Sequence, residues 1–198
     1  MKKSLALFDF DGTITRKDTF LEIIKFAKGN SKFYSGLIFL SPVLIFYKLK
    51  FIPNWRAKEI FFAYFFKNDS IAEFQKVCRD FAIEKVPDLI RPSALRKIQE
   101  HQASFDRIII ITASAAEWIK PWSDPLGIEL IATRWEEKNG RITGKIQGRN
   151  CYGPVKKELI LELINPADYK TISVYGDTSG DKEMLTLGTS TFFKYFND

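Results

Sequence analysis

The chain has 198 residues, of which 45% are hydrophobic, so it can bury a sizeable core, and this excludes an intrinsically disordered protein. Its formal net charge is +6, from 30 Lys and Arg against 24 Asp and Glu, which favours anionic partners such as phosphorylated metabolites, acidic lipids or nucleic acid. Cys78 and Cys151 lack a CxxC spacing and His101 is the one histidine, which excludes a disulfide framework or zinc site and predicts a cytoplasmic protein.

The first predicted element is a buried strand that leads directly into two acidic residues. Mostly apolar residues at 5–8 precede Asp9, and Gly12 interrupts the pattern shortly after Asp11. Active sites of open α/β sheets lie at the carboxyl ends of their strands. Acidic side chains at the end of a buried strand need compensating positive charge. The segment therefore predicts a bound cation and an anionic substrate.

A helical pattern follows from Asp18 to about Ala103, with apolar residues three or four positions apart. We expect about five helices here and no strand. Turn and cap residues mark the boundaries between them, at 29–31, 53–54, 68–70, 87–88 and Pro92. The pattern predicts an all-helical insertion over residues 17–103.

Two parts of this insertion are unusually apolar, at 33–47 and 61–66. The first is uncharged over 15 residues, short of the ~20 that span a bilayer, so we expect a buried or interfacial helix. Core packing is one interpretation of the aromatic residues. The other is membrane-surface contact, with basic residues near acidic headgroups, namely Lys32, Lys48, Lys50 and Arg56. Arg56 is also interpreted as an exposed helix residue or a ligand for a substrate anion.

After Ala103, strand and helix patterns alternate, which is typical of a parallel sheet. We expect strands at 107–112, 128–132, 171–175 and 191–193, and helices from about 115, over 155–164 and ending at 187. Asn139-Gly140 predicts a type I′ hairpin within 133–146. Together the elements predict an α/β fold: a three-layer, Rossmann-like parallel sheet core formed by residues 1–16 and 104–198, with the helical cap inserted. We expect His101 to lie at the surface.

Four separated motifs resemble those of the haloacid dehalogenase superfamily, specifically its phosphoserine-phosphatase-like branch with a helical cap (subfamily IB). The first, Asp-x-Asp-Gly-Thr, is complete at 9–13, and the fourth, Gly-Asp-x-x-x-Asp, occupies 176–181. The second is a Ser or Thr that ends a hydrophobic strand, matched by Thr112. The third is a Lys at the start of a later helix, matched by Lys156, although the adjacent Lys157 is an alternative. Their order and spacing carry more weight than any single match.

The resemblance implies a Mg²⁺-dependent phosphatase that forms an aspartyl-phosphate. Asp9 corresponds to the nucleophile, and Asp11 to the acid that protonates the leaving group and later activates water. Asp9, Asp11 through its main-chain oxygen, and Asp177 would hold the metal. A phosphate dianion repels a carboxylate nucleophile, which is why a cation is needed there.

The remaining motif positions would bind the phosphoryl group or support it. The expected contacts come from Thr112, with possible help from Ser114, from Lys156, and from backbone amides around Gly12. Asp181 would orient Lys156 or a metal-bound water. Asp18 stands where phosphoserine phosphatases usually carry a substrate-binding Glu, and it is equally interpreted as the first-turn residue of a helix.

The expected substrate is a phosphorylated small molecule. Three alternatives stay open: a phosphotransferase or phosphomutase with the same intermediate, a membrane-peripheral lipid-phosphate phosphatase, and a noncatalytic phosphate-binding module. Nucleic acid is not an expected partner, because only the net charge favours it and no basic aromatic motif accompanies that charge. The sequence does not determine an oligomeric state.

Overall fold

The computed structural model describes residues 3–198, and a parallel sheet lies at its centre. The strand order is β3-β2-β1-β6-β7, and all four pairings are parallel. The strands are β1 (Lys3–Phe8), β2 (Arg107–Ala115), β3 (Glu129–Thr133), β6 (Tyr169–Gly176) and β7 (Ser190–Phe193). The expected Rossmann-like α/β architecture is confirmed, because β1 sits in the middle of the sheet while its neighbours are distant in sequence.

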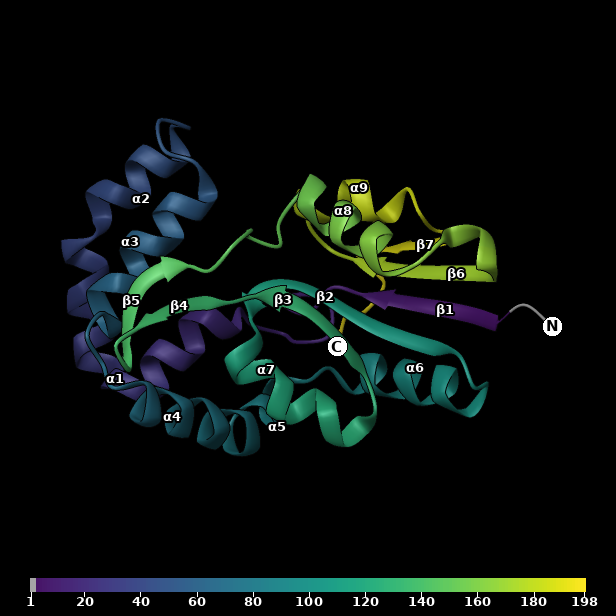
Figure 1. Cartoon of the computed structure of the whole chain (residues 1–198), viewed down its shortest axis with the longest axis horizontal. Coiled ribbons are helices and arrows are strands. Elements are labelled where there is room, and N and C mark those ends of the chain that lie inside the picture. Colours follow the sequence, from purple (N-terminus) through teal and green to yellow (C-terminus); the bar gives the residue numbers. More distant parts are fainter. Residues whose placement is uncertain (1–2) are drawn as a thin grey trace.

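Helices cover both faces of this sheet (Figure 1). One face packs on α6 (Pro92–Ala103) and α7 (Ala116–Ser123), and the other on α8 (Pro154–Leu163) and α9 (Lys182–Leu185). Alternation along β1 explains both layers: Leu5 and Leu7 enter the cluster with α8, whereas Ala6 and Phe8 enter the larger cluster on the opposite face. A strand buried on both sides reads as the continuous apolar run seen in the sequence.

The helical insertion, which we call the cap, lies between β1 and β2. Within the described chain it comprises α1 (Thr19–Phe39), α2 (Ser41–Lys48), α3 (Asn54–Phe66), α4 (Ile71–Glu84), α5 (Val86–Leu89) and α6. One helix more than expected arises because α5 is a separate four-residue turn. The break expected at 29–31 is confirmed, because Gly29 has a non-helical φ of 80° and ψ of 159°, so α1 consists of two helical parts that meet at a kink. The limits of the cap at 17 and 103 stay a prediction.

None of the helices described in residues 3–198 is both long enough and apolar enough to cross a bilayer. Short 3₁₀ turns connect other elements, at Asp124–Leu126, Pro166–Asp168 and Ser179–Asp181.

A β-hairpin joins the sheet to the cap. It is formed by β4 (Trp135–Lys138) and β5 (Arg141–Ile146), and its turn residues Asn139 and Gly140 have φ of 53° and 72°. Positive φ at both turn positions is the geometry of the predicted type I′ hairpin. The Trp135 ring stacks on Phe62 of α3, with centroids 3.5 Å apart. The hairpin therefore packs on the cap, although it follows β3 in the chain.

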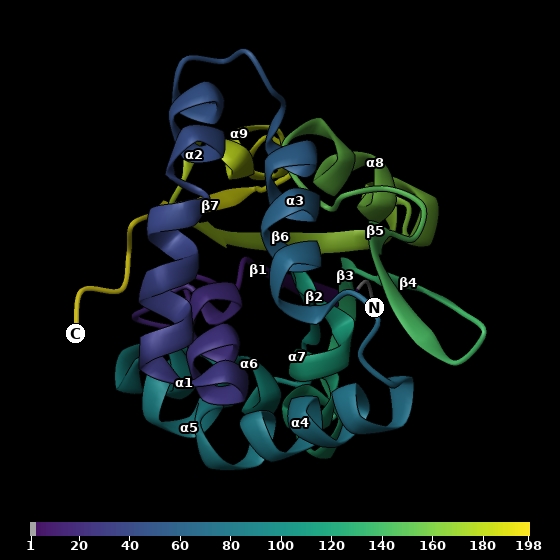
Figure 2. The same cartoon turned by 90° about the vertical axis from the view of Figure 1, so that its left-hand side faces the viewer.

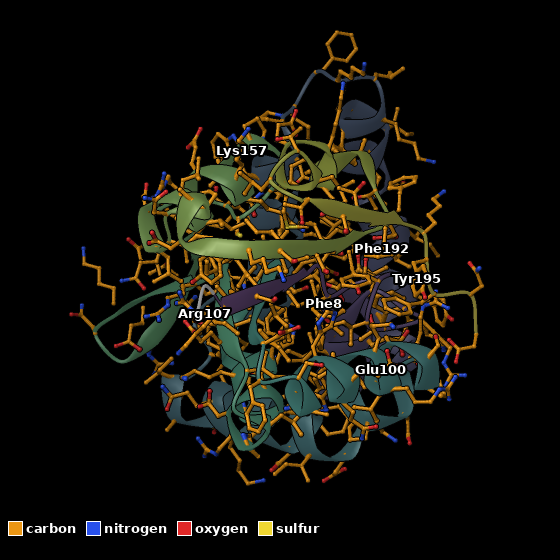
Figure 3. The ribbon with its side chains drawn as sticks, turned by 90° about the vertical axis from the view of Figure 1, so that its right-hand side faces the viewer. Phe8, Glu100, Arg107, Lys157, Phe192 and Tyr195 are labelled. Carbon is orange, nitrogen blue, oxygen red and sulfur yellow. The ribbon has the colours of Figure 1, made fainter. Side chains whose placement is uncertain are left out.

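The prediction that His101 is a surface residue is wrong. Its Nδ1 lies 2.7 Å from an Asp106 carboxylate oxygen, its Nε2 lies 3.0 Å from the Tyr175 hydroxyl, and its ring meets Phe8 edge-on. The last turn of α6 directs this side chain towards the sheet rather than towards solvent. Figure 3 shows the neighbouring C-terminal segment, where Tyr195 and Phe192 lie near Phe8. This aromatic cluster fixes the edge of the sheet beside β7.

Candidate active site

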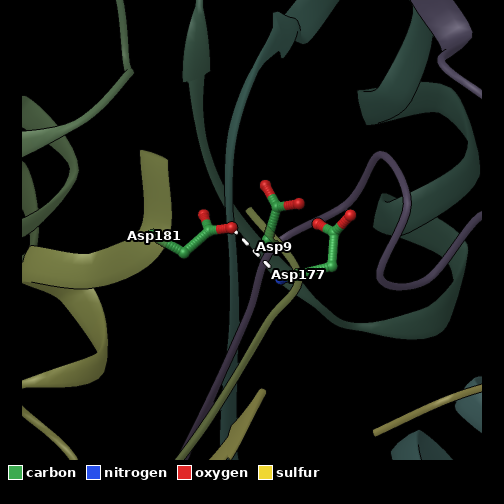
Figure 4. A group of neighbouring side chains, drawn as sticks. All are labelled: Asp9, Asp177 and Asp181. Carbon is green, nitrogen blue, oxygen red and sulfur yellow. Dashed lines mark hydrogen bonds between the residues drawn. The ribbon is translucent and has the colours of Figure 1, made fainter. Parts of the chain in front are cut away.

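The motif residues converge at the carboxyl ends of the central strands. Asp9 directly follows β1, and Asp177 directly follows the adjacent strand β6. Carboxylate oxygens of Asp9, Asp177 and Asp181 all lie within 4.8 Å of one another (Figure 4). The backbone N–H of Asp9 donates to the Tyr175 carbonyl across the two strands at 3.0 Å, which fixes the position of Asp9. Segments separated by more than 160 residues thus form one acidic cluster.

Glycine is required at position 12 because the loop after β1 lies very close to the Asp177 carboxylate. Its φ is +85°, a conformation that L side chains rarely adopt, and a Cβ atom there would lie 2.3 Å from Oδ2 of Asp177. The adjacent Thr13 donates its hydroxyl to Asp177 Oδ1 at 3.1 Å and to Asp9 Oδ2 at 3.4 Å. Thr13 belongs to the first motif, although no role is predicted for it from the sequence. It links the two carboxylates directly.

Lys156 is the cation of the cluster. Its Nζ lies 2.5 Å from Asp9 Oδ1 and 2.6 Å from Asp181 Oδ1, and its side chain is 3% exposed. Burial lowers the pKa of Lys156, but the charges of Asp9 and Asp181 outweigh burial and leave the pKa raised. Lys157 is partly exposed, and its Nζ donates at the surface to Thr186 at 2.9 Å instead of to the acids; Figure 3 marks its position. The geometry therefore separates the two adjacent lysines.

One lysine does not balance the acids around it. Burial raises the pKa of Asp9 to about 8, although Lys156 opposes this shift. Burial, followed by the charge of Asp181, also raises the pKa of Asp177. Ionised carboxylates crowded in this way favour a site for an additional cation.

Asp181 is already occupied by hydrogen bonds. Its Oδ1 accepts from Lys156, and its Oδ2 accepts from the backbone N–H groups of Asp177 and Thr178 and from the Thr178 hydroxyl, at 3.0–3.2 Å. Such a carboxylate orients Lys156 and the loop after β6, as expected of a supporting residue. Asp9 and Asp177 are left as the side chains of the cluster best placed to hold a metal.

A cavity of about 460 Å³ opens beside the cluster. It brings together most of the predicted site residues, namely Asp9, Asp11, Asp18, Thr112, Ser114 and Lys156. The Thr112 hydroxyl accepts from the Ser114 backbone N–H at 2.9 Å, and the Ser114 hydroxyl accepts from Thr19 at 3.1 Å. Ser114 therefore holds the start of α1 against β2 at the cavity wall.

The interpretation of Asp18 as a first-turn residue is confirmed, while its substrate-binding role stays a prediction. Its carboxylate caps α1 by accepting from the backbone N–H groups of Phe20 and Leu21, and it also lines the cavity. Asp11 lies nearby and accepts from the backbone N–H of Thr19 at 2.7 Å. Burial, then the charge of Asp11, raises the pKa of Asp18 to about 6.

Sequence reasoning missed Lys58, which reaches this cavity from α3. Its Nζ donates to the Ala113 carbonyl on β2, and its positive charge opposes the rise in the pKa of Asp18. Burial lowers the pKa of Lys58, and Asp18 and Asp11 counteract this. Arg56 instead pairs with Glu59 at 3.1 Å and is half exposed. No sequence signal distinguishes the two basic residues.

Comparison with known proteins adds to this geometry. A family model described as haloacid dehalogenase-like hydrolase matches residues 6–186. The chain belongs to this family. The family expected from the four motifs is confirmed, and so is the expectation of an enzyme of the hydrolase class.

The haloacid dehalogenase-like chain is similar over its length to several proteins. It is 34% identical to Protein CicA of Caulobacter vibrioides across 97% of this chain and 86% of that protein. A Bordetella pertussis protein of unknown function has a TM-score of 0.81 and 21% identity, covering 96% of this chain and 89% of the other. A substrate-bound phosphoserine phosphatase has a TM-score of 0.68 and 18% identity, covering 98% and 86%. These two likenesses show the shared fold.

Proposed function

We propose that this haloacid dehalogenase-like hydrolase is a Mg²⁺-dependent phosphatase that uses Asp9 as its nucleophile. The observation that carries the proposal is the buried bridge from Lys156 to Asp9 and Asp181, with the Asp177 carboxylate beside it. Lys156 only partly offsets the burial that raises the pKa of Asp9, so a second cation beside Asp177 would keep Asp9 ionised and able to attack. The names of the similar phosphoserine phosphatases agree with a phosphorylated small-molecule substrate.

The protein's own residues account for both halves of the reaction. An Asp9 oxygen forms a bond to phosphorus as the ester P–O bond breaks, and Asp11 donates a proton to the departing alkoxide. Asp11 then accepts a proton from the water that attacks the aspartyl-phosphate, which releases inorganic phosphate and regenerates Asp9. Lys156 and the Thr112 hydroxyl would bind the phosphoryl oxygens.

The donor set fits Mg²⁺, because every atom offered is a hard oxygen. Asp9 and Asp177 would hold the ion through carboxylates and Asp11 through its main-chain carbonyl. When bound, Mg²⁺ would reduce the repulsion between the Asp9 carboxylate and the phosphate dianion. The cytoplasm stays the expected location of this activity.

Asp9→Asn tests the proposal. We expect the wild type to hydrolyse p-nitrophenyl phosphate with Mg²⁺ and to stop when EDTA removes the metal. The amide is a poor nucleophile, so Asp9→Asn should lower turnover by about 10⁴-fold or more. The control is Asp168→Asn, because Asp168 is exposed and lies outside the cavity. Thermal melting shows whether each variant folds, and a folded Asp9→Asn protein with wild-type turnover would contradict the proposal.

A phosphotransferase would share the first half-reaction. Added methanol or glycerol separates the two activities, because a transferase would convert the alcohol into a phosphate ester at the expense of inorganic phosphate. We expect inorganic phosphate as the main product.

A further inference from the structure

Helix α2 is apolar yet lacks buried side chains. Six of its eight residues are apolar, and none of the eight described residues is buried. A helix that is apolar on most sides normally lies inside a protein or against another apolar phase. We call residues 38–55, which include α2 and the loop that follows, the cap tip. Its large exposed hydrophobic residues are Ile38, Phe39, Ile45, Phe46, Tyr47, Leu49, Phe51 and Trp55.

The cap tip protrudes from the molecule. In Figures 1 and 2, α2 and the loop to α3 extend beyond the body of the protein. The Phe46 and Phe51 rings contact each other, with centroids 6.1 Å apart, and are 52% and 73% exposed. Apolar surface gathered in this way marks an interaction site.

The charges around the cap tip identify its partner. Residues 23–58 contain seven Lys or Arg and no Asp or Glu. Lys48 and Lys50 alternate with the exposed apolar residues of 45–51 and are themselves exposed. A surface of apolar side chains interleaved with lysines matches an anionic bilayer, whose acyl region accepts the former while its headgroups bind the latter.

The catalytic cavity extends to this same helix. Leu44 and Tyr47 of α2 line the cavity, together with Leu37 and Phe61. Asp9 and other polar residues also line it. Ile45 and Phe46, on the same helix, are exposed. Thus α2 contributes one part to the cavity wall and another to the outer surface. The apolar lining suits an aliphatic chain attached to the phosphate rather than a small polar alcohol.

We propose that the cap tip docks on an anionic membrane surface and that the substrate is a phosphate monoester with a long apolar chain, drawn from that surface. The inference rests on the proposed function, because the reaction is the same: water is consumed, the P–O ester bond breaks, and inorganic phosphate leaves. The lipid alcohol stays with the bilayer. The exposed residues of the cap tip would control how the enzyme reaches the membrane surface. The residues of α2 that line the cavity would control how the apolar chain of the substrate fits.

The docking surface is tested by sedimentation with vesicles of phosphatidylcholine, with or without phosphatidylglycerol. The full chain should bind the anionic vesicles at least about tenfold better. The double variant Phe46→Ser and Phe51→Ser should weaken binding by about tenfold or more, and Lys48→Glu with Lys50→Glu should abolish the preference for anionic lipid. The control is Phe105→Ser, since Phe105 is 89% exposed but precedes β2 at the opposite end of the sheet.

The substrate class is tested by comparing p-nitrophenyl phosphate with phosphatidate in the same vesicles. The double aromatic variant should keep wild-type turnover of the soluble ester, which also shows that it is folded, and should lose at least about tenfold on phosphatidate. If the soluble ester is hydrolysed but phosphatidate is not, or if the vesicles bind the double variant as well as wild type, the inference is overturned while the phosphatase proposal stands. Absence of turnover on both esters overturns the phosphatase proposal itself.

Discussion

The carboxyl edge of the sheet and the cap tip are organised by opposite rules. At the sheet edge, charged groups are buried and paired, as in the bridge from Lys156 to Asp9 and Asp181. At the cap tip, apolar side chains are exposed, and residues 38–55 contain no Asp or Glu. Burial of charge is costly and is retained where chemistry needs it. The contrast indicates that catalysis and substrate choice reside in separate segments, which meet in one cavity.

The strongest test of the catalytic half is Lys156→Met. The change leaves two buried acids without their cation, so we expect a loss of about 3–5 kcal/mol in the free energy of unfolding. We also expect about 10³-fold slower hydrolysis, because the phosphoryl group loses a charged partner. Urea denaturation and p-nitrophenyl phosphate turnover measure the two effects.

Lys157→Met is the matched control, since Lys157 is adjacent in the chain but partly exposed and bonded to Thr186 rather than to the acids. Its bond to Thr186 lies at the surface, and the change should alter stability by no more than about 0.5 kcal/mol. Equal effects of the two substitutions would show that the sheet edge does not depend on a paired buried lysine.

The sequence predicted the sheet edge well because its chemistry restricts residue types. Asp9 and Asp177 each follow an apolar strand, so parallel pairing places them together. Lys156 and Lys157 could not be separated in the same way, because both occupy the first turn of α8. Only the rotation of that helix on the sheet decides which lysine enters the cluster.

The cap was less predictable for a related reason. Its helices were recognised from their spacing, but the role of Lys58 depends on how α3 lies over β2, which local sequence does not specify. His101 illustrates the same limit, because its position in α6 resembles that of any last-turn residue. The exposure of α2 was one of two interpretations of the apolar run, because such a run fits either core packing or an interfacial helix and only the packing of α2 decides between them.

Gly12→Ala probes how closely the first and fourth motifs must approach. The new Cβ would meet the Asp177 carboxylate, so we expect Mg²⁺ affinity and kcat/KM to fall by about 10–100-fold. Titration of the rate with Mg²⁺ measures the effect. Gly148→Ala is the control, because Gly148 also has positive φ, +76°, but no neighbour within 4 Å of the added Cβ. If both variants respond equally, backbone strain rather than displacement of Asp177 is responsible.

Lys58→Met tests whether the cap contributes charge to catalysis as well as apolar surface. Removing a cation beside Asp18 and Asp11 should reduce kcat/KM about tenfold, equal to about 1.4 kcal/mol. The pKa of Asp18, raised to about 6 in the folded protein, should rise further because Lys58 opposes that shift. The pH profile of kcat/KM should therefore shift to higher pH. Arg56→Met, on the same helix but outside the cavity, should leave the profile in place; an unchanged Lys58→Met profile would limit the cap to an apolar role.

The smallest expected effect lies at the junction between cap and core, at Glu117 of α7. Among residues 3–198, the buried Oε2 atom of this partly buried side chain has no hydrogen-bond partner, while Oε1 accepts from the Trp135 backbone N–H at 3.1 Å. Burial raises the pKa of Glu117 above its ordinary 4.5. The folded state therefore binds the proton more tightly than the unfolded chain, and stability must decline as the pH rises above that value.

Glu117→Gln removes the titrating proton but keeps an oxygen for Trp135. We expect a gain on the order of 1 kcal/mol at about pH 8, a smaller gain at about pH 5, and unchanged hydrolysis. Urea midpoints at the two pH values measure this. The control is Glu137→Gln, because Glu137 is an exposed residue of β4. Its urea midpoint should equal that of the wild type at both pH values. A gain that is the same at both pH values would mean that packing, rather than the charge of a buried carboxylate, sets the stability of the junction.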